Sequence, residues 1–317
     1  PGLARSSRSS VATASLQSLA ELSSRFWLPW TDRAFGDEFR PAMDAAPAVP
    51  FGALRFDGSA HVPSPEAAAE LDERLRRSVC TDAVVPAVVD FPGSATSSGG
   101  GVLFETGPRG RERALASARN LMLRLLTGLP PGKARFTIID PVGLGQSFAG
   151  FMTLADYEEL LVSSRIWTED RHIEQRLTDL TEHMENVIQK YLRDEFATIE
   201  AYNEHAGEIA EPYRFLIIAD YPSGFTENAG RRLRSILESG ARCGVYVIMV
   251  ADPKPKTPAA LPFDTIREHA TVVRHDETED RFRLVGRGGT GKPTPRGGLD
   301  ENDAADGAGE RRGLGAL

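Results

Sequence analysis

Continuously apolar runs alternate with amphipathic segments through the middle of the chain. Three of these runs are Ala134–Asp140 (ARFTIID), Arg214–Asp220 (RFLIIAD) and Gly244–Val250 (GVYVIMV), and the first two end in an acid. A shorter run covers Val102–Glu105. Runs that are apolar on both faces predict strands of a mostly parallel sheet with helices on each side. The predicted fold class is therefore α/β.

Between these runs, apolar residues recur at spacings of three and four, which predicts helices. One such helix is expected at Arg113–Thr127, and a long one from about Asp170 to Phe196. Thr226 stands where an N-cap is preferred, ahead of a third helix that ends near Ser239. Each predicted helix thus separates two predicted strands.

The chain divides by composition into four regions. Residues 1–47 are rich in Ala and Ser and predict a helical or linker segment, whereas residues 48–98 predict a smaller α/β extension of the core. Residues 99–285 hold the main domain. Residues 286–317 are rich in Gly, Arg and Asp with almost no apolar periodicity, so we expect a disordered low-complexity tail.

Two of these regions contain more specific features. The extension has strand patterns at Val49–Phe56 and Val84–Phe91 that enclose a helix pattern at Pro65–Val79. The first region contains an aromatic cluster around Trp27 and Trp30, for which core packing and contact with a neighbouring domain are both open readings.

Composition places the chain among ordinary globular proteins. Of its 317 residues, 41% are hydrophobic and 26% charged, and no apolar run is long enough for a membrane span. Only Cys80 and Cys243 are cysteines, which fits a reducing, bacterial-type cytoplasm. The histidines show no metal-ligand spacing. The chain begins at Pro1 without a Met, so we expect a piece of a longer protein, whose missing segments leave membrane association open.

A strand, a glycine-containing turn and a helix start follow one another at Val102–Arg113, the arrangement of a phosphate-binding P-loop. Candidate nucleotide-binding residues are Thr106, Gly107, Gly110, Arg111 and Glu112. Arg occupies the position of the P-loop Lys, and Glu that of the Mg²⁺-binding Ser or Thr. Arg is able to bind a phosphate, whereas Glu would repel one. A structural turn and a working nucleotide site both remain open.

Asp220 ends a buried strand, as does the acid that holds Mg²⁺ in the Walker B element. It is the candidate Mg²⁺ ligand and catalytic acid, with a local turn-capping role as the alternative. Tyr221 stands where a water-activating Glu would follow. A Tyr with a pKa near 10 is no general base at neutral pH, so we expect slow or absent hydrolysis. A second P-loop-like string lies at Gly286–Lys292. Pro293 stands at its Ser or Thr position and no helix is predicted after it, so we attribute the match to the Gly-rich composition of this region.

The order of these features resembles the motor domain of the FtsK/SpoIIIE family of DNA translocases, which are RecA-like P-loop ATPases. The resemblance covers nearly half of the chain, from Ala134 to about Val250, with the P-loop unit before it. The segments that carry it are IIDP at Ile138–Pro141, HMENVIQKY with Met184–Glu185 and Tyr191, the stretch Ile199–Asn203, and ARCGVYVIMVADP after the acid-ended strand.

The departures from the family pattern fall where ATP is hydrolysed. The resemblance maps the family's Lys and Ser to Arg111 and Glu112, and its catalytic Glu to Tyr221. Its sensor Gln maps to Asp252, and its intersubunit Arg to Ala241. We therefore expect a degenerate member, comparable to the inactive modules of tandem ATPases such as those of type VII secretion.

The leading hypothesis is an ATP-binding module of a larger translocase-type assembly with weak or no hydrolysis. The resemblance implies ATP, Mg²⁺, a ring or tandem-module assembly and double-stranded DNA as partner, although the net charge of −8 argues against DNA. The alternative is a non-catalytic module that binds a peptide or a neighbouring subunit. A third option is an active ATPase that uses Arg111 and another acid, with Asp252 at the sensor position as the candidate. No direct membrane contact is expected for these residues.

Overall fold

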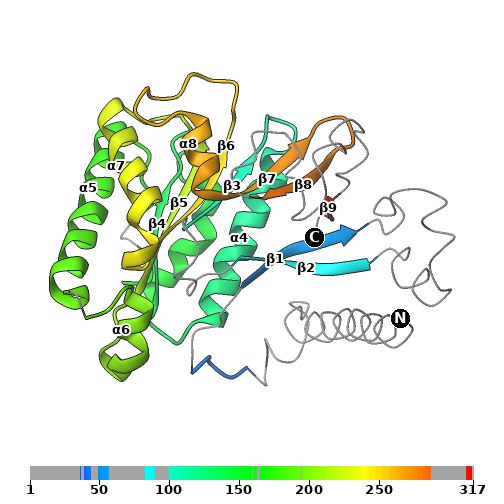
Figure 1. The fold of residues 1–317 in the computed structure, drawn as a ribbon. Helices are drawn as coiled ribbons and strands as arrows, with labels where there is room; N and C mark the ends of the chain where they lie inside the picture. Colours follow the sequence, from blue (N-terminus) through cyan, green and yellow to red (C-terminus); the bar gives the residue numbers. More distant parts are fainter. Residues whose placement is uncertain are drawn as a thin grey trace, which may run out of the picture.

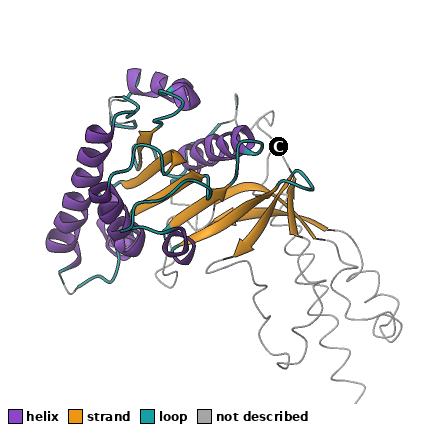
Figure 2. Ribbon diagram, turned by 90° about the horizontal axis from the view of Figure 1, so that it is seen from above, coloured by secondary structure: helices purple, strands orange, loops and turns teal. Residues whose placement is uncertain are grey.

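The computed structural model describes residues 36, 39–43, 49–56, 83–89, 100–158, 160–162, 165–193, 195–286 and 312–315. These residues form one mixed sheet with helices on both faces (Figures 1 and 2). The strands are β1 (Val49–Phe56), β2 (Ala83–Val89), β3 (Gly101–Glu105), β4 (Ala134–Ile139), β5 (Tyr213–Tyr221), β6 (Val245–Ala251), β7 (Ala270–Asp276), β8 (Arg281–Gly286) and β9 (Arg312–Gly315).

The sheet has the spatial order β2-β1-β9-β8-β7-β3-β6-β5-β4. Strands β7, β3, β6, β5 and β4 are parallel to their neighbours in this group, whereas β8, β9, β1 and β2 continue the sheet with antiparallel pairing. The chain passes from β3 to β4, which lies at the far edge of the sheet. The predicted mostly parallel core is therefore confirmed. Hairpin strand β8 adds an antiparallel edge to it, which the apolar runs alone do not predict.

Helices cover both faces of the parallel strands. They are α4 (Arg111–Gly128), α5 (Asp170–Val187), α6 (Ile199–Ala206), α7 (Glu227–Ser239) and α8 (Phe263–Glu268). Helix α4 lies on one face, whereas α7 and α8 lie on the other and α5 packs against α7 (Figure 2). The predicted apolar stripe of α4 is buried, with Leu115, Ala118 and Leu125 each at most 1% exposed. Burial of such apolar faces is what drives the layers together.

The long helix predicted to reach Phe196 ends earlier. Helix α5 stops at Val187 and continues as a π-helical turn, Ile188–Leu192. Arg193 then leaves helical geometry, with φ 14° and ψ 52°. A π-helical turn is wider than an α-helical one and is often found at functional sites. Here it separates α5 from α6 and changes the direction in which the side chains of the last turn point.

Several sequence predictions fall on residues outside the described ranges. They include the aromatic cluster at Trp27 and Trp30, the helix at Pro65–Val79, and most of the tail that follows Gly286. Four residues of that tail, Arg312–Gly315, form strand β9 between β1 and β8. None of the helices in the described part of the chain combines the length and apolar character that a bilayer crossing requires.

The parallel strands all end at one edge of the sheet, the upper edge in Figure 1, and α4 begins there. Acidic residues cluster at these ends: Glu105 ends β3, Asp140 follows β4, and Asp220 lies near the end of β5. Asp140 is fully buried, and its carboxylate accepts hydrogen bonds from the backbone N–H groups of Gly143 and Ser147, both at 3.0 Å. Ligands of open α/β sheets bind outside this carboxyl edge, which makes it the candidate site.

Candidate nucleotide site

The turn between β3 and α4 is short and closed by its own hydrogen bonds. The backbone N–H of Thr106 donates to Ala251 O on β6 at 2.9 Å, and that of Gly110 donates to Gly107 O at 3.3 Å. The Thr106 hydroxyl also donates to Gly107 O, at 2.9 Å. Because Thr106 is only 5% exposed, this hydroxyl is committed to the turn. The predicted strand–turn–helix geometry of a P-loop is therefore present.

Gly110 lies directly against a buried histidine. A Cβ atom at this position would lie 2.6 Å from His275 Cγ, and closer still to the Thr106 hydroxyl. The His275 side chain is 0% exposed, with Nε2 3.1 Å from Asp280 Oδ1 and 2.9 Å from Arg113 Nη2. His275 thus fills the space behind the turn, and only glycine fits between them.

Arg111, the predicted counterpart of the P-loop lysine, binds Asp220, the predicted Walker B acid. Its Nε donates to Asp220 Oδ1 at 2.6 Å, and its Nη2 donates to Oδ2 at 2.7 Å. The pair is partly shielded from solvent, with 27% and 13% of the two side chains exposed. The hydrogen bond with Asp220 raises the pKa of Arg111, whereas burial lowers it. The residue predicted to bind phosphate and the residue predicted to bind Mg²⁺ therefore form an ion pair with each other.

The rest of the turn fits a bound triphosphate poorly. Glu112, the predicted counterpart of the Mg²⁺-binding Ser or Thr, accepts a hydrogen bond at Oε1 from Arg111 Nη1 at 2.7 Å. Pro108 is exposed in the turn and has no N–H to offer a phosphate oxygen. No group of three or more His, Cys, Asp or Glu side chains within the described ranges has the arrangement of a metal site. The residues present do not match the donor set of an Mg·ATP site.

Tyr221 and Asp252, which the sequence resemblance maps to a catalytic and a sensor position, are both engaged elsewhere. The Tyr221 side chain is fully buried and its hydroxyl donates to Leu261 O at 3.0 Å. Burial raises the pKa of this hydroxyl above its ordinary value, so it is no base. Asp252 turns to its own loop, where Oδ1 accepts from the Lys254 N–H at 2.9 Å.

A charged cluster that the sequence did not predict lies next to the turn. Glu105 is only 5% exposed and receives hydrogen bonds from two arginines. Arg267 Nε and Arg274 Nε each lie 3.0 Å from one of its carboxylate oxygens. If the pattern GxxxxGK is aligned on Gly110 and Arg111, Glu105 stands at the first glycine. The presence of a Glu at this position is the feature of the sequence that could have indicated an unusual role for Glu105. The two arginine partners were not predictable from spacing.

Comparisons with known proteins give structural similarity without sequence similarity. No protein-family model matches the chain, and neither does any curated protein. The solved structure of EssC (ATPases 2 and 3) from Geobacillus thermodenitrificans superposes with a TM-score of 0.52 at 16% identity, covering 87% of this chain and 44% of that one. The cytoplasmic domain of the type VII secretion ATPase EccC from Thermomonospora curvata gives a TM-score of 0.50 at 18% identity, covering 82% and 26%.

This chain spans less than half the length of either of these ATPase chains. At such low identity the agreement concerns the fold. It agrees with the predicted RecA-like core and its mostly parallel sheet. The chain therefore has the fold of the FtsK/SpoIIIE-type P-loop ATPases.

Proposed function

We propose that this chain is a non-hydrolysing FtsK/SpoIIIE-type module that serves a structural or regulatory role in a larger ATPase assembly. The observation that carries the proposal is the ion pair between Arg111 and Asp220. In an active P-loop ATPase these two positions contact the phosphates and the Mg²⁺ shell. Here each side chain neutralises the other, so Mg·ATP would have to break a two-bond charged interaction before it bound.

The chemistry around the pair supports the same proposal. Glu112 would place a negative charge beside the triphosphate, where the Mg²⁺-binding hydroxyl is needed. The buried Tyr221 cannot activate water. Each substitution alone would weaken ATP hydrolysis, and together they remove the Mg²⁺ ligand and the base from one site.

We propose a protein partner rather than DNA. One of the two similar structures is a type VII secretion ATPase and the other is a unit of two ATPases, and this chain is much shorter than either. A neighbouring module of the same parent assembly is therefore the partner we expect, in a cytoplasmic location. The net charge of −8 opposes binding to double-stranded DNA, which the family resemblance alone implied.

The test is thermal unfolding of the chain with Mg·ATP from micromolar to millimolar concentration, combined with a phosphate-release assay. We expect no saturable change in Tm and no turnover above background. A site filled at a hundredfold excess over Kd would add about 2.7 kcal/mol, a rise of a few degrees.

The matched control is the double substitution Arg111→Lys with Glu112→Thr, which supplies the lysine and the hydroxyl of the P-loop pattern and leaves Glu105 at its first position. A saturable Tm rise in the unmodified chain that Asp220→Ala abolishes would establish weak ATP binding, and the structural proposal would then be wrong. Steady turnover abolished by Asp220→Asn would contradict it more strongly, in favour of an active ATPase.

A further inference from the structure

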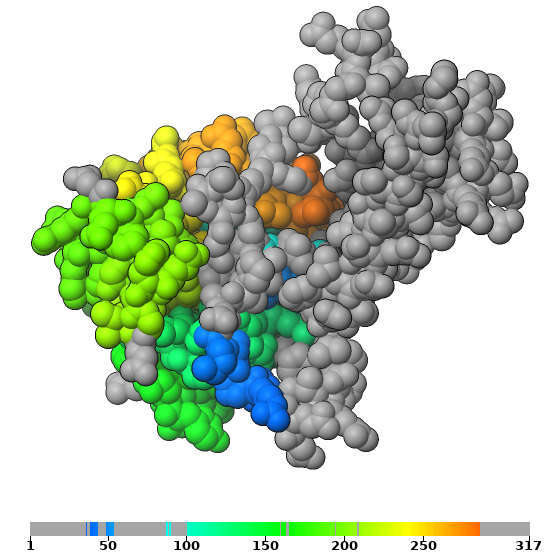
Figure 3. Space-filling view, turned by 60° about the horizontal axis from the view of Figure 1, so that its bottom comes forward, coloured from blue at the N-terminus to red at the C-terminus, as the bar shows by residue number. Residues whose placement is uncertain are grey.

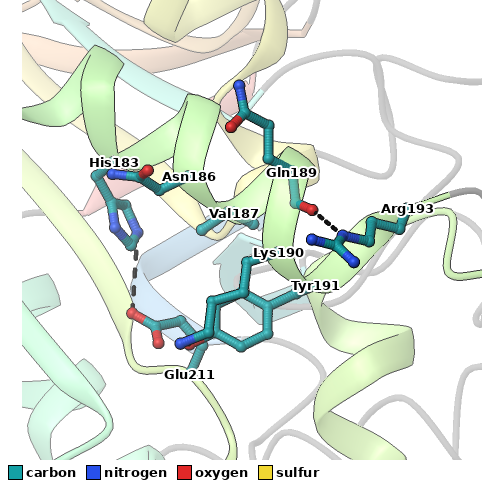
Figure 4. A pocket seen from close by; sticks show the side chains of 8 residues that line it. All are labelled: His183, Asn186, Val187, Gln189, Lys190, Tyr191, Arg193 and Glu211. Carbon is teal, nitrogen blue, oxygen red and sulfur yellow. Dashed lines mark hydrogen bonds and ion pairs between the residues drawn. The ribbon is translucent and has the colours of Figure 1, made fainter.

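A polar cavity lies at the edge of the sheet opposite to Arg111 and Asp220. Helix α5 runs from the carboxyl edge to the amino edge, and the cavity lies where its π-helical turn meets the loop before β5. Its volume is about 400 Å³, within the range of small-molecule sites. The lining residues are His183, Asn186, Val187, Gln189, Lys190, Tyr191, Arg193 and Glu211 (Figure 4). In Figure 3, where this edge turns toward the viewer, α5 and α6 belong to the green and yellow-green surface.

Positive charge dominates around this cavity. Arg135 on β4 and Arg214 on β5 are register partners at the amino ends of adjacent parallel strands. Burial and the charge of Arg135 lower the pKa of Arg214. Burial, together with these two arginines, lowers the pKa of His183 to about 4. Both shifts are caused first by burial, and the charge of a neighbouring arginine adds to each, whereas Glu211 opposes the shift at Arg214.

A single carboxylate, that of Glu211, offsets these charges among the lining residues. Its Oε1 lies 3.7 Å from Arg214 Nη2 and 4.0 Å from His183 Nε2, and Figure 4 shows it directed at the histidine. Lys190 and Arg193 add two further positive charges from the lining. Arg214 pairs with Glu211 from outside the lining, and the charges of Arg135 and Arg214 both act on His183, in a protein whose net charge is −8.

Several buried side-chain nitrogens near the cavity have no hydrogen-bond partner among the described residues. The Nε atoms of Arg135 and Arg214 and Nε2 of His183 are buried without a hydrogen-bond partner in the described part of the chain. Because they are sealed from solvent, they act on the cavity through their field. The donors that could contact a ligand in the cavity directly are the exposed Lys190 Nζ and the exposed side-chain amide of Asn186. Lys190 Nζ also lies 3.0 Å from the Tyr191 hydroxyl.

We propose that this cavity binds a small oxyanion of the phosphate class, with Lys190, Tyr191 and Asn186 as the contacting residues. A dianion would relieve the excess positive charge that Glu211 only partly neutralises. The wide turn Ile188–Leu192 places Lys190 and Tyr191 side by side over the cavity (Figure 4). The site is independent of ATP, because the P-loop turn lies at the other edge of the sheet.

The experiment is a titration of the chain with inorganic phosphate, followed by thermal unfolding and calorimetry, against sodium chloride of equal ionic strength. We expect a saturable rise in Tm beyond the chloride effect. Lys190→Met should raise the Kd for phosphate about tenfold, the effect of one lost charge-assisted hydrogen bond. Because Lys190 is exposed, the substitution should leave the fold intact.

Two variants locate the binding. Lys256→Met removes a positive charge from another exposed lysine and should leave the Kd unchanged, as should Arg111→Ala at the P-loop turn. O-phosphoserine in a parallel titration distinguishes a free ion from a phosphate group carried on an organic molecule. Absence of a saturable shift by either ligand would overturn the proposal. So would binding that Arg111→Ala abolishes and Lys190→Met leaves unchanged, since phosphate would then lie at the P-loop.

Discussion

Arg111 donates two parallel hydrogen bonds to Asp220, from Nε at 2.6 Å and from Nη2 at 2.7 Å. Asp220 reaches this position because its backbone has a positive φ of 59°, beside an irregularity in the pairing of β5 with β6. Two-bond guanidinium–carboxylate pairs have a fixed planar geometry that lysine cannot reproduce. The arginine at the P-loop position therefore closes the turn onto β5.

A double-mutant cycle of Arg111→Ala and Asp220→Ala should give a coupling energy of about 1–3 kcal/mol, because the pair is two-bonded and partly buried. The measurement is urea unfolding of the four proteins. The control cycle uses Arg234 and Glu238, an exposed pair on α7 at 2.7 Å, for which about 0.3–0.5 kcal/mol is expected. Equal coupling in the two cycles would show that Arg111 and Asp220 do not stabilise the turn.

Glu105→Gln should cost about 3 kcal/mol of unfolding free energy. The substitution removes the charge that pairs with Arg267 and Arg274, and leaves two arginines at a site where Glu105 is 5% exposed. Urea unfolding at neutral pH gives the value. Glu169→Gln is the control, since that exposed carboxylate pairs with Arg171 at 3.2 Å and should contribute less than about 1 kcal/mol. A loss as small as that of the control would mean that the arginines are solvated without Glu105.

Gly110→Ala should destabilise the protein by about 1–3 kcal/mol, because the new methyl group would meet the Thr106 hydroxyl and the buried ring of His275. Gly150→Ala is the matched control: a Cβ there has no atom within 4 Å and the backbone has no positive φ. Differential scanning calorimetry of both variants measures the effect. If the two changes in Tm agree, the turn has room to move away from β7.

Stability should fall with pH in the acidic range because of His183, whose pKa is about 4 in the folded protein against 6.5 for an unperturbed histidine. Above pH 6.5 the side chain is neutral in both states and has no effect. As the pH falls from 6.5 towards 4, the unfolded chain takes up a proton that the folded protein refuses, so unfolding becomes easier. The loss should approach roughly 3 kcal/mol near pH 4.

His183→Gln removes this dependence, and the measurement is urea unfolding of both proteins between pH 7 and pH 4. The charged groups that face His183, namely Arg135, Arg214, Glu211 and the nearby Lys190, remain in both, so the difference between the two curves isolates the histidine. Parallel curves would show that His183 takes up its proton in the folded protein as well.

The core fold followed closely from local pattern. The strands predicted at Ala134–Asp140 and Arg214–Asp220 appear as β4 and β5, each displaced by no more than one residue at either end. Thr226 caps α7 as expected, accepting a hydrogen bond from the Ala229 N–H at 3.1 Å. Such features depend on neighbours within a few residues, because helix and strand periods and cap positions are local properties. The predicted end of α5 was less accurate, because no residue in the sequence marks the π-helical turn that follows Val187.

The sequence by itself also determined which residues the turn between β3 and α4 contains, and that Arg111 and Glu112 follow Gly110 in place of a lysine and a hydroxyl residue. Only the tertiary structure decided which side chains Arg111 and Glu105 contact. Arg111 meets a carboxylate 109 positions away, and Glu105 meets arginines 162 and 169 positions away. The sequence gives the charge of each side chain, but the order of the strands in the sheet determines which oppositely charged side chain it contacts. In this fold β3 lies between β6 and β7, and that order brings the three acid and arginine pairs together at one edge.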